Sequence, residues 1–163
     1  MIRKLVALFA ACAAVVLPAQ PASAIVNPVV ISLKNVQSAL CMDVLGFNQN
    51  DGAGVVQWDC NGLDNQKFTL ENRGDNEYAL KVQFNGKCLD MPGNLADNVQ
   101  VTVSRCHYDR NQIWFFERMA DNPDQFQIRN KFTNKCLENG IQTEKNKPVF
   151  QFQCHQRSHQ RWI

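Results

Sequence analysis

The 163-residue sequence lacks both an apolar run long enough to span a membrane and a surplus of charge of either sign. The longest apolar run, Leu5–Leu17, is shorter than the roughly 20 residues that a spanning helix needs. Arg3 and Lys4 are the only charged residues among the first 24, so the rest of the chain carries 15 basic and 15 acidic side chains. This balance offers no electrostatic attraction to nucleic acid or to an anionic membrane, and neither nucleic-acid binding nor membrane insertion is expected.

The N-terminus has the pattern of a secretory signal peptide. The two basic residues precede the apolar run, and Ala22-Ser23-Ala24 provides a small-residue cleavage site. We predict that residues 1–24 are a signal peptide, that residues 25–163 form the mature domain, and that the protein is secreted. The alternatives are an uncleaved anchor and a lipid-modified Cys12, whose upstream residues match a lipoprotein signal poorly.

Signatures of catalysis and of zinc binding by cysteine and histidine are missing as well. The sequence has no G-x-S-x-G nucleophile motif and no C-x2-C pair of the kind that holds structural zinc. The three histidines, His107, His155 and His159, lie just after a cysteine or beside a glutamine in predicted loops, where we expect them at the surface. We therefore predict a protein that is not an enzyme and holds no metal or cofactor. A glycosidase pair among the scattered carboxylates is the alternative.

No segment keeps the helical spacing of apolar residues beyond two turns, and short β-prone runs occur instead. Clusters of Gly, Asn and Asp separate these runs, as in "GFNQNDGAG" and "PGNLADN". The pattern predicts an all-β chain. Its expected strands include residues 29–33, 55–58, 68–71, 78–82, 99–103, 113–116, 126–128 and 149–152.

Six of the seven cysteines follow residue 24, and they mark a threefold repeat. The first cysteines of the three units lie 47 and 48 residues apart and are Cys41, Cys88 and Cys136. The second cysteines lie 18 or 19 residues further on and are Cys60, Cys106 and Cys154. Six residues after each second cysteine stands a glutamine, with an aromatic two residues later: Gln66 and Phe68, Gln112 and Trp114, Gln160 and Trp162. Units of this size cannot each bury a core, so we expect them to pack around a shared axis.

The repeat also predicts the disulfide pairing. An even number of cysteines in an exported chain indicates disulfide bonds, and six cysteines allow fifteen pairings. Equivalent units should form equivalent bridges, which are Cys41–Cys60, Cys88–Cys106 and Cys136–Cys154. Each closes a loop of about 19 residues, worth roughly 3 kcal/mol of stability in the chain-entropy account.

The three units read "CMDV…VVQWDCNGLDNQKF", "CLDM…VTVSRCHYDRNQIW" and "CLEN…FQFQCHQRSHQRW". With paired cysteines, a C-L-D-like start and an N-Q-x-W-like end in three copies, the chain from about Val29 to Ile163 resembles the ricin B-type lectins, the (QxW)3 family. The resemblance implies a β-trefoil of three repeats of about 47 residues with one disulfide each, called alpha, beta and gamma. Its twelve strands would divide into a six-stranded barrel and a six-stranded cap, with up to one shallow sugar site per repeat.

The resemblance also implies where each sugar site lies. The family places a carboxylate two residues after the first cysteine, an aromatic two before the second, and an amide before the Q-x-W glutamine. An aromatic ring covers the apolar face of a sugar, and a carboxylate accepts hydrogen bonds from its hydroxyls. In repeat alpha these residues, with the glutamine, are Asp43, Trp58, Asn65 and Gln66. Val56 replaces a glutamine that the family often has, and strand alternation points the adjacent Gln57 to the other face. Alpha is the repeat most expected to bind.

Repeats beta and gamma match the site less well. Repeat beta keeps Asp90 and Asn111 but has Ser104 in place of the aromatic, so no ring supports a sugar unless His107 or Tyr108 does. A structural turn role is the alternative for Asp90. At the carboxylate, aromatic and amide positions, repeat gamma has Glu138, Phe152 and His159. The Q-x-W glutamines and aromatics are assigned mainly to the fold, the former bonding within the domain and the latter filling the core.

The function expected from the resemblance is secreted carbohydrate binding, with low affinity at each site. Expected ligands are galactose-type sugars or plant or cell-surface polysaccharides, and a separate catalytic or toxin subunit is a further partner that the resemblance suggests. The alternative is an interaction or accessory protein, such as a toxin subunit or an inhibitor, whose sugar sites have decayed. The glutamine that the family often has two residues before the site aromatic is absent from all three repeats, which have Val56, Thr102 and Phe150 there. This absence favours that alternative.

Overall fold

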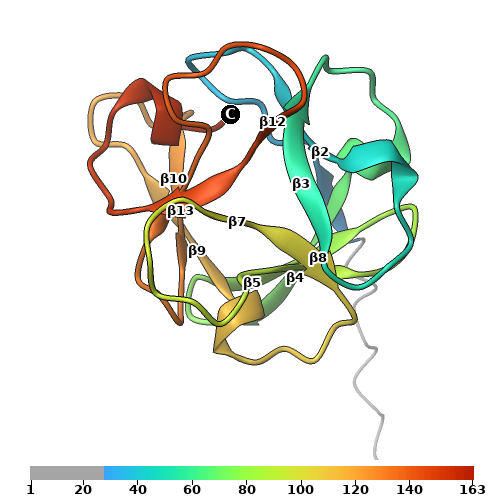
Figure 1. Ribbon diagram of the computed structural model, residues 1–163. Helices are drawn as coiled ribbons and strands as arrows, with labels where there is room; N and C mark the ends of the chain where they lie inside the picture. The colour runs from blue at the N-terminus through green and yellow to red at the C-terminus, as the bar shows by residue number, and fades with distance from the viewer. Residues whose placement is uncertain (1–27) are drawn as a thin grey trace, which may run out of the picture.

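The protein, described here by a computed structural model for residues 28–163, consists of three similar lobes around a central axis (Figure 1). The described residues form short strands and 3-10 turns. The strands are β1 Val29–Ile31, β2 Cys41–Val44, β3 Ala53–Trp58, β4 Phe68–Gly74, β5 Glu77–Val82, β6 Cys88–Asp90, β7 Val99–Gln100, β8 Thr102–Ser104, β9 Trp114–Arg118, β10 Phe126–Asn130, β11 Cys136–Glu138, β12 Lys147–Pro148 and β13 Phe150–Phe152. The 3-10 helices are η1 Leu45–Phe47, η2 Asp64–Gln66, η3 Arg110–Gln112 and η4 Ser158–Gln160.

The predicted all-β class is confirmed, while the predicted signal peptide lies outside the described residues. None of the helices among residues 28–163 is long and apolar enough to cross a membrane.

Three strands that the sequence patterns did not predict begin at the first cysteine of each unit. They are β2, β6 and β11, and they pair antiparallel with β3, β8 and β13, which lie just before the second cysteines. Two of the three end on an acidic residue, a type that is depleted in strands, and all are only three or four residues long. This pairing brings the two cysteines of each unit together. All three predicted disulfides are present, with Cα–Cα distances of 5.0 to 5.1 Å.

A ring of backbone hydrogen bonds joins the three repeats at the axis. Val55 donates its N–H to the carbonyl of Val101, Val101 donates to Val149, and Val149 donates to Val55, each over 3.0 Å. The three valines are fully buried and lie 46 and 48 residues apart. Because Val101 bonds to other repeats, the predicted strand 99–103 divides there into β7 and β8, and the predicted strand 149–152 begins one residue later, as β13. The ring therefore joins each repeat directly to both of the others.

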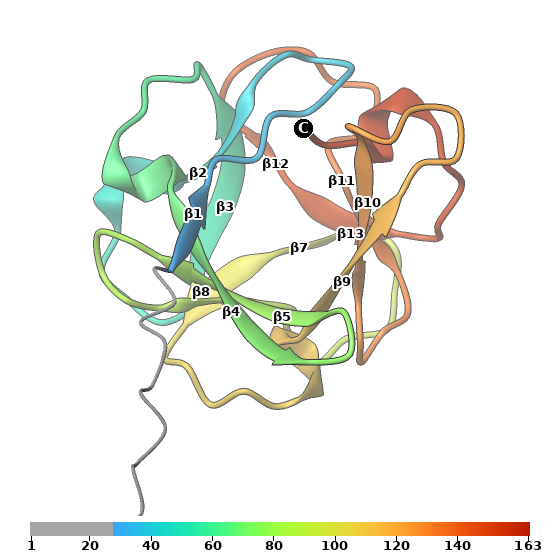
Figure 2. The same ribbon diagram turned by 180° about the vertical axis from the view of Figure 1, so that it is seen from behind.

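The Q-x-W aromatics meet in the core, as predicted. Phe68, Trp114 and Trp162 are fully buried in one cluster with side chains from all three repeats. The indole N–H of Trp114 donates to the carbonyl of Leu89 over 3.2 Å, and that of Trp162 donates to Leu137 over 3.3 Å. Phe68 has no such donor, but it keeps the core position. Figure 2 shows the hairpins β4–β5 and β9–β10, with β1 beside β4, on the opposite side of the molecule.

Residues 161–163 connect repeat gamma to the start of repeat alpha. Trp162 exchanges two backbone hydrogen bonds with Phe126, and Ile163 exchanges two with Lys34, all of 2.9 Å. Arg161 accepts a further backbone bond from Val36. These contacts complete the circle of repeats at the one place where no covalent connection runs between neighbours.

Candidate functional site

The same buried network surrounds a carboxylate in all three repeats. The Nε2 of the Q-x-W glutamine donates to the carboxylate two residues after the first cysteine, which lies in β2, β6 or β11. The pairs are Gln66 and Asp43 at 2.8 Å, Gln112 and Asp90 at 2.6 Å, and Gln160 and Glu138 at 2.6 Å. Each glutamine Oε1 accepts the backbone N–H of the residue after the second cysteine, over 2.9 Å. The three glutamines are fully buried, so their predicted role in the fold is confirmed, and the fully buried Gln66 supports the site from below rather than at its surface.

In repeat alpha this network lies under a pocket of about 220 Å³ that brings together three of the four predicted residues. Asp43 lies on β2 beneath the pocket, Trp58 lies at the end of β3, and Asn65 lies in η2. The volume is smaller than the roughly 300 Å³ at the lower end of ordinary small-molecule pockets, as a shallow site for one sugar ring would be.

Asp43 retains hydrogen-bonding capacity although it is buried. Asn65 Nδ2 donates to Asp43 Oδ1 over 2.9 Å, and Gln66 donates to Oδ2. A carboxylate offers about four lone-pair positions, so two are left for ligand hydroxyls. The carbonyl oxygen of Asn65 is buried beside the pocket without a hydrogen-bond partner among the described residues. Burial raises the pKa of Asp43 above 3.8, although the hydrogen bonds from Gln66 and Asn65 act in the opposite direction.

One part of the pocket wall was not predicted from the sequence. It consists of Leu45, Gly46 and Phe47 in η1, directly after β2. Gly46 and Phe47 have φ values of 63° and 54°, and this turn exposes both Leu45 and Phe47. The Phe47 ring packs edge-on against Phe84, with centroids 5.3 Å apart. Gly46 was the sequence signal for this turn, since glycine adopts positive φ values without steric cost.

Gln57 confirms the expected alternation in β3, since it points away from Asp43. Its Nε2 donates to the carbonyls of Gln142 and Glu144 at 3.0 and 2.9 Å, and its Oε1 accepts from Asn139. Gln57 therefore holds the neighbouring gamma loop, and it does not substitute for the polar residue that Val56 replaces.

Repeat beta has the network without the aromatic ring. Asn111 Nδ2 donates to Asp90 Oδ1 over 3.1 Å, and Asp90 is buried at the end of β6 rather than in a turn. His107 Nε2 lies 3.4 Å from Asp90 Oδ2, so this histidine does approach the carboxylate. Tyr108 instead lies against the Arg73 guanidinium, 4.0 Å from the ring centroid. Ser104 provides no flat apolar surface for a sugar.

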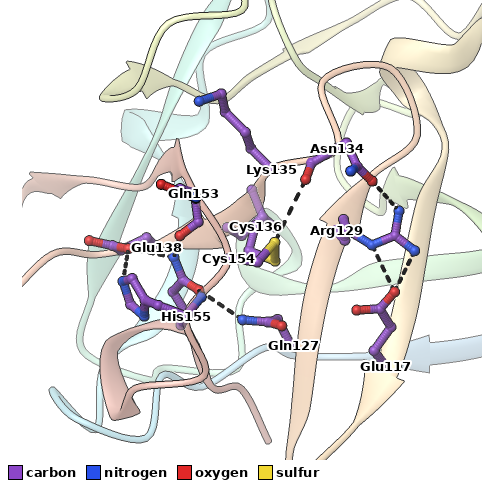
Figure 3. The surroundings of a disulfide bond; sticks show 12 residues. Glu117, Gln127, Arg129, Asn134, Lys135, Cys136, Glu138, Gln153, Cys154 and His155 are labelled. Carbon is purple, nitrogen blue, oxygen red and sulfur yellow. Dashed lines mark hydrogen bonds and ion pairs between the residues drawn. A yellow bond between two sulfur atoms is a disulfide. The ribbon is translucent and has the colours of Figure 1, made fainter.

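Repeat gamma places two histidines against its carboxylate. Figure 3 shows His155 directed at Glu138, next to the Cys136–Cys154 bridge. His155 Nε2 lies 3.0 Å from Glu138 Oε2, and His159 Nε2 lies 3.6 Å from Oε1. The His155 ring also approaches Phe152, with centroids 6.0 Å apart. The predicted Glu138, Phe152 and His159 do come together, but His155 occupies space between the aromatic and the carboxylate.

The prediction that all three histidines lie at the surface is wrong for His159, which is only 7% exposed. It lies in η4 at the position of Asn65 and Asn111, whose side chains also turn inward, and this equivalence is the reason for its burial. Burial lowers the pKa of His159, while the charge of Glu138 acts in the opposite direction. His155 is half-buried, and the side chain of His107 is 44% exposed.

Three repeats, three bridges and a carboxylate network in each define a β-trefoil of the lectin class. Residues 29–162 match the family profile of the ricin-type beta-trefoil lectin domain, and the chain belongs to this family. Membership supports carbohydrate binding as the class of function.

Solved structures share the fold. A designed threefold-symmetric protein, ThreeFoil, is 26% identical with a TM-score of 0.78, over 82% of this chain and 95% of that one. A ricin B-like lectin from Macrolepiota procera, solved in complex with lactose, is 20% identical with a TM-score of 0.73, over 86% and 96%. An exo-beta-1,3-galactanase from Clostridium thermocellum is 23% identical with a TM-score of 0.75, over 80% of this chain and 28% of the enzyme. The comparison with curated proteins gave no match.

Proposed function

We propose that the protein is a secreted lectin that binds a sugar in the pocket of repeat alpha. The observation that carries this proposal is the convergence of a buried carboxylate, an indole and an amide on one shallow pocket, in a chain of a lectin family. Trp58 would cover the apolar face of the ring, and Asp43 would accept hydrogen bonds from two hydroxyls. Asn65 would orient that carboxylate, since its Nδ2 donates to Asp43 Oδ1.

The other repeats support this choice by contrast. Repeat beta has the carboxylate and the amide but no aromatic surface. In repeat gamma the carboxylate already contacts His155 and Gln160. A protein with one shallow site should bind weakly, and galactose-type sugars or plant or cell-surface polysaccharides are the ligand classes that we propose. We propose no enzymatic activity for this domain.

Secretion is supported by the three disulfides, because such bonds form and persist in oxidising compartments. N-terminal sequencing of protein recovered outside the producing cells tests this part of the proposal. A mature N-terminus at Ile25 is expected, and a chain that retains its first 24 residues would contradict the predicted cleavage.

A glycan array and titration of the best ligand test the sugar site. Asp43→Asn and Trp58→Ala are each expected to weaken binding about 10-fold or more, since a hydrogen bond to a charged group contributes about 1.5–3 kcal/mol. Asp90→Asn is the matched control, because it changes the same network in a repeat that has Ser104 at the position of Trp58. Wild-type binding by both alpha variants, or an equal loss in the Asp90 variant, would refute the alpha assignment.

Binding should also depend on pH through Asp43. Because burial raises the pKa of this carboxyl, it protonates at a higher pH than an ordinary aspartate, and affinity should fall as the pH is lowered toward that value. Stability changes with the opposite sign: the contribution of Asp43 is fully present below its unfolded pKa and is lost as pH rises through the raised folded pKa. Calorimetric titration of the ligand at several acidic pH values measures the first effect. Unfolding of wild type against Asp43→Asn at the same pH values measures the second.

A further inference from the structure

Metal-ligating atoms of three side chains converge in repeat gamma. His155 Nε2 lies 3.0 Å from Glu138 Oε2 and 3.2 Å from His159 Nε2, and His159 Nε2 lies 3.6 Å from Glu138 Oε1. A zinc ion bound tetrahedrally at about 2.0–2.2 Å holds its ligand atoms roughly 3.3–3.6 Å apart. The two imidazole nitrogens, and each of them with one oxygen of Glu138, thus have nearly the spacing of adjacent corners of a zinc coordination tetrahedron, and one ligand atom from each residue lies within 4.8 Å of the others.

We propose that Glu138, His155 and His159 bind one divalent cation of the zinc class. Two imidazoles and one carboxylate form a known zinc ligand set that leaves the fourth position to water or another ligand. The mixture of nitrogen and oxygen suits zinc, copper or nickel, whereas calcium takes six to eight oxygen ligands and magnesium needs a near-octahedral oxygen shell. This site is independent of the sugar pocket proposed in repeat alpha.

Neighbouring groups already orient the three ligands. His159 Nδ1 lies 3.2 Å from Gln37 Oε1, and a proton on Nδ1 leaves the Nε2 lone pair directed at the cluster. Gln160 Nε2 donates to Glu138 Oε2 over 2.6 Å and holds that carboxylate in place. Such outer partners set the tautomer and direction of metal ligands. Because Gln37 belongs to the first repeat, a bound ion would also reinforce the junction between repeats gamma and alpha.

His155 must change its tautomer before the cluster can bind an ion. His155 Nδ1 accepts the backbone N–H of Arg157 over 3.3 Å, which places the ring proton on Nε2, facing Glu138. Metal binding would shift that proton, by exchange with solvent, from Nε2 to Nδ1, so that the ring stays neutral, the Nε2 lone pair faces the ion and this long hydrogen bond is lost. The side chain of His155 is 24% exposed, whereas those of Glu138 and His159 are 7% and 9% exposed, so solvent reaches the cluster from the His155 side.

The other repeats show which substitutions create the cluster. At the three positions of Glu138, His155 and His159, repeat alpha has Asp43, Asn61 and Asn65. Repeat beta has Asp90, His107 and Asn111 at the same positions. Only gamma carries two histidines, and the residues of the other repeats provide replacements that this fold already accommodates.

Titration of untagged, chelator-stripped protein with ZnCl₂ by calorimetry tests the site. We expect one equivalent of Zn²⁺ to bind, and His155→Asn and His159→Asn each to weaken binding by about 100-fold or more. Gln37→Ala, which removes only an outer partner, should weaken it about 10-fold. His107→Asn is the control and should leave the affinity unchanged. Co²⁺ should give the intense visible absorption of a four-coordinate ion, and this absorption should vanish in His159→Asn.

The variants must unfold at the wild-type temperature in excess chelator, which separates loss of a ligand from loss of the fold. Absence of Zn²⁺ binding by the wild type, or undiminished binding by a correctly folded His159→Asn protein, would overturn the proposal. So would an equal loss of affinity in His107→Asn. Sugar binding measured in the same chelator should persist, so a failure of the zinc site and a failure of the alpha sugar site give different results.

Discussion

Replacing Trp162 with alanine is expected to destabilise the domain by about 3–5 kcal/mol, the usual cost of removing a large buried aromatic side chain. Trp162 is 0% exposed and lies in the common core of the three repeats. Its loss would leave a cavity and an unpaired carbonyl at Leu137. Since whole domains are stable by only about 5–15 kcal/mol, this one substitution should remove a large share of the total. Equilibrium unfolding in urea measures it.

Trp162→Phe is the matched control, because repeat alpha has Phe68 at the equivalent position. This variant keeps an aromatic ring in the core and loses the indole hydrogen bond, which costs about 1 kcal/mol, together with some buried area. Deletion of residues 161–163 should be more severe than either substitution, since it also removes the backbone pairing with Phe126 and Lys34. Equal stability of the alanine and phenylalanine variants would contradict the core role of Trp162.

The architecture could be predicted because it is encoded three times. Cysteines and Q-x-W elements recur at nearly constant separations, so equivalence between units determined the disulfide pairing and the core aromatics. The ring of backbone hydrogen bonds among the three valines could not be predicted from strand patterns. Val55, Val101 and Val149 bond across repeats, and periodicity along one strand carries no information about a partner in another repeat.

The candidate site was predictable where the residues lie at fixed offsets from the cysteines. Asp43, Trp58 and Asn65 meet in one pocket, as the motif implied. The Leu45–Phe47 wall was missed because it is a turn with two positive φ values and has no apolar periodicity.

The approach of His155 to Glu138 was missed for a different reason. These residues are 17 positions apart, and their meeting depends on the path of the loop after Cys154. The i, i+4 spacing of His155 and His159 was the one available signal, and it was read as two surface residues.

Replacing Gln66 with alanine should lower the free energy of unfolding by about 3 kcal/mol, although this residue contributes hydrogen bonds rather than apolar core packing. The change would leave Asp43 Oδ2, the carbonyl of Asp59 and the N–H of Asn61 without their partners. Asp43 is buried, and a buried polar group that loses its partner costs about 1–3 kcal/mol, or more when it is charged, whereas the bonds at Asp59 and Asn61 are only partly buried. Sugar affinity should fall as well, because Asp43 would lose the donor that orients it under the pocket.

A double-mutant cycle separates these contributions. In an Asp43→Asn background the Gln66→Ala cost should shrink by about 1–2 kcal/mol, because no buried charge is left unpaired. Urea unfolding of the four proteins gives this coupling energy. The corresponding cycle with Gln112→Ala and Asp90→Asn should give a similar coupling, since the three bonds of Gln66 have counterparts at Gln112. Gln112 Oε1 accepts one further bond, from the N–H of Tyr108. The two beta substitutions should leave sugar binding unchanged, because repeat beta has Ser104 in place of the aromatic residue Trp58. A coupling near zero in repeat alpha would mean that Gln66 does not hold Asp43, and a loss of sugar binding in the beta variants would mean that the two repeats are not functionally distinct.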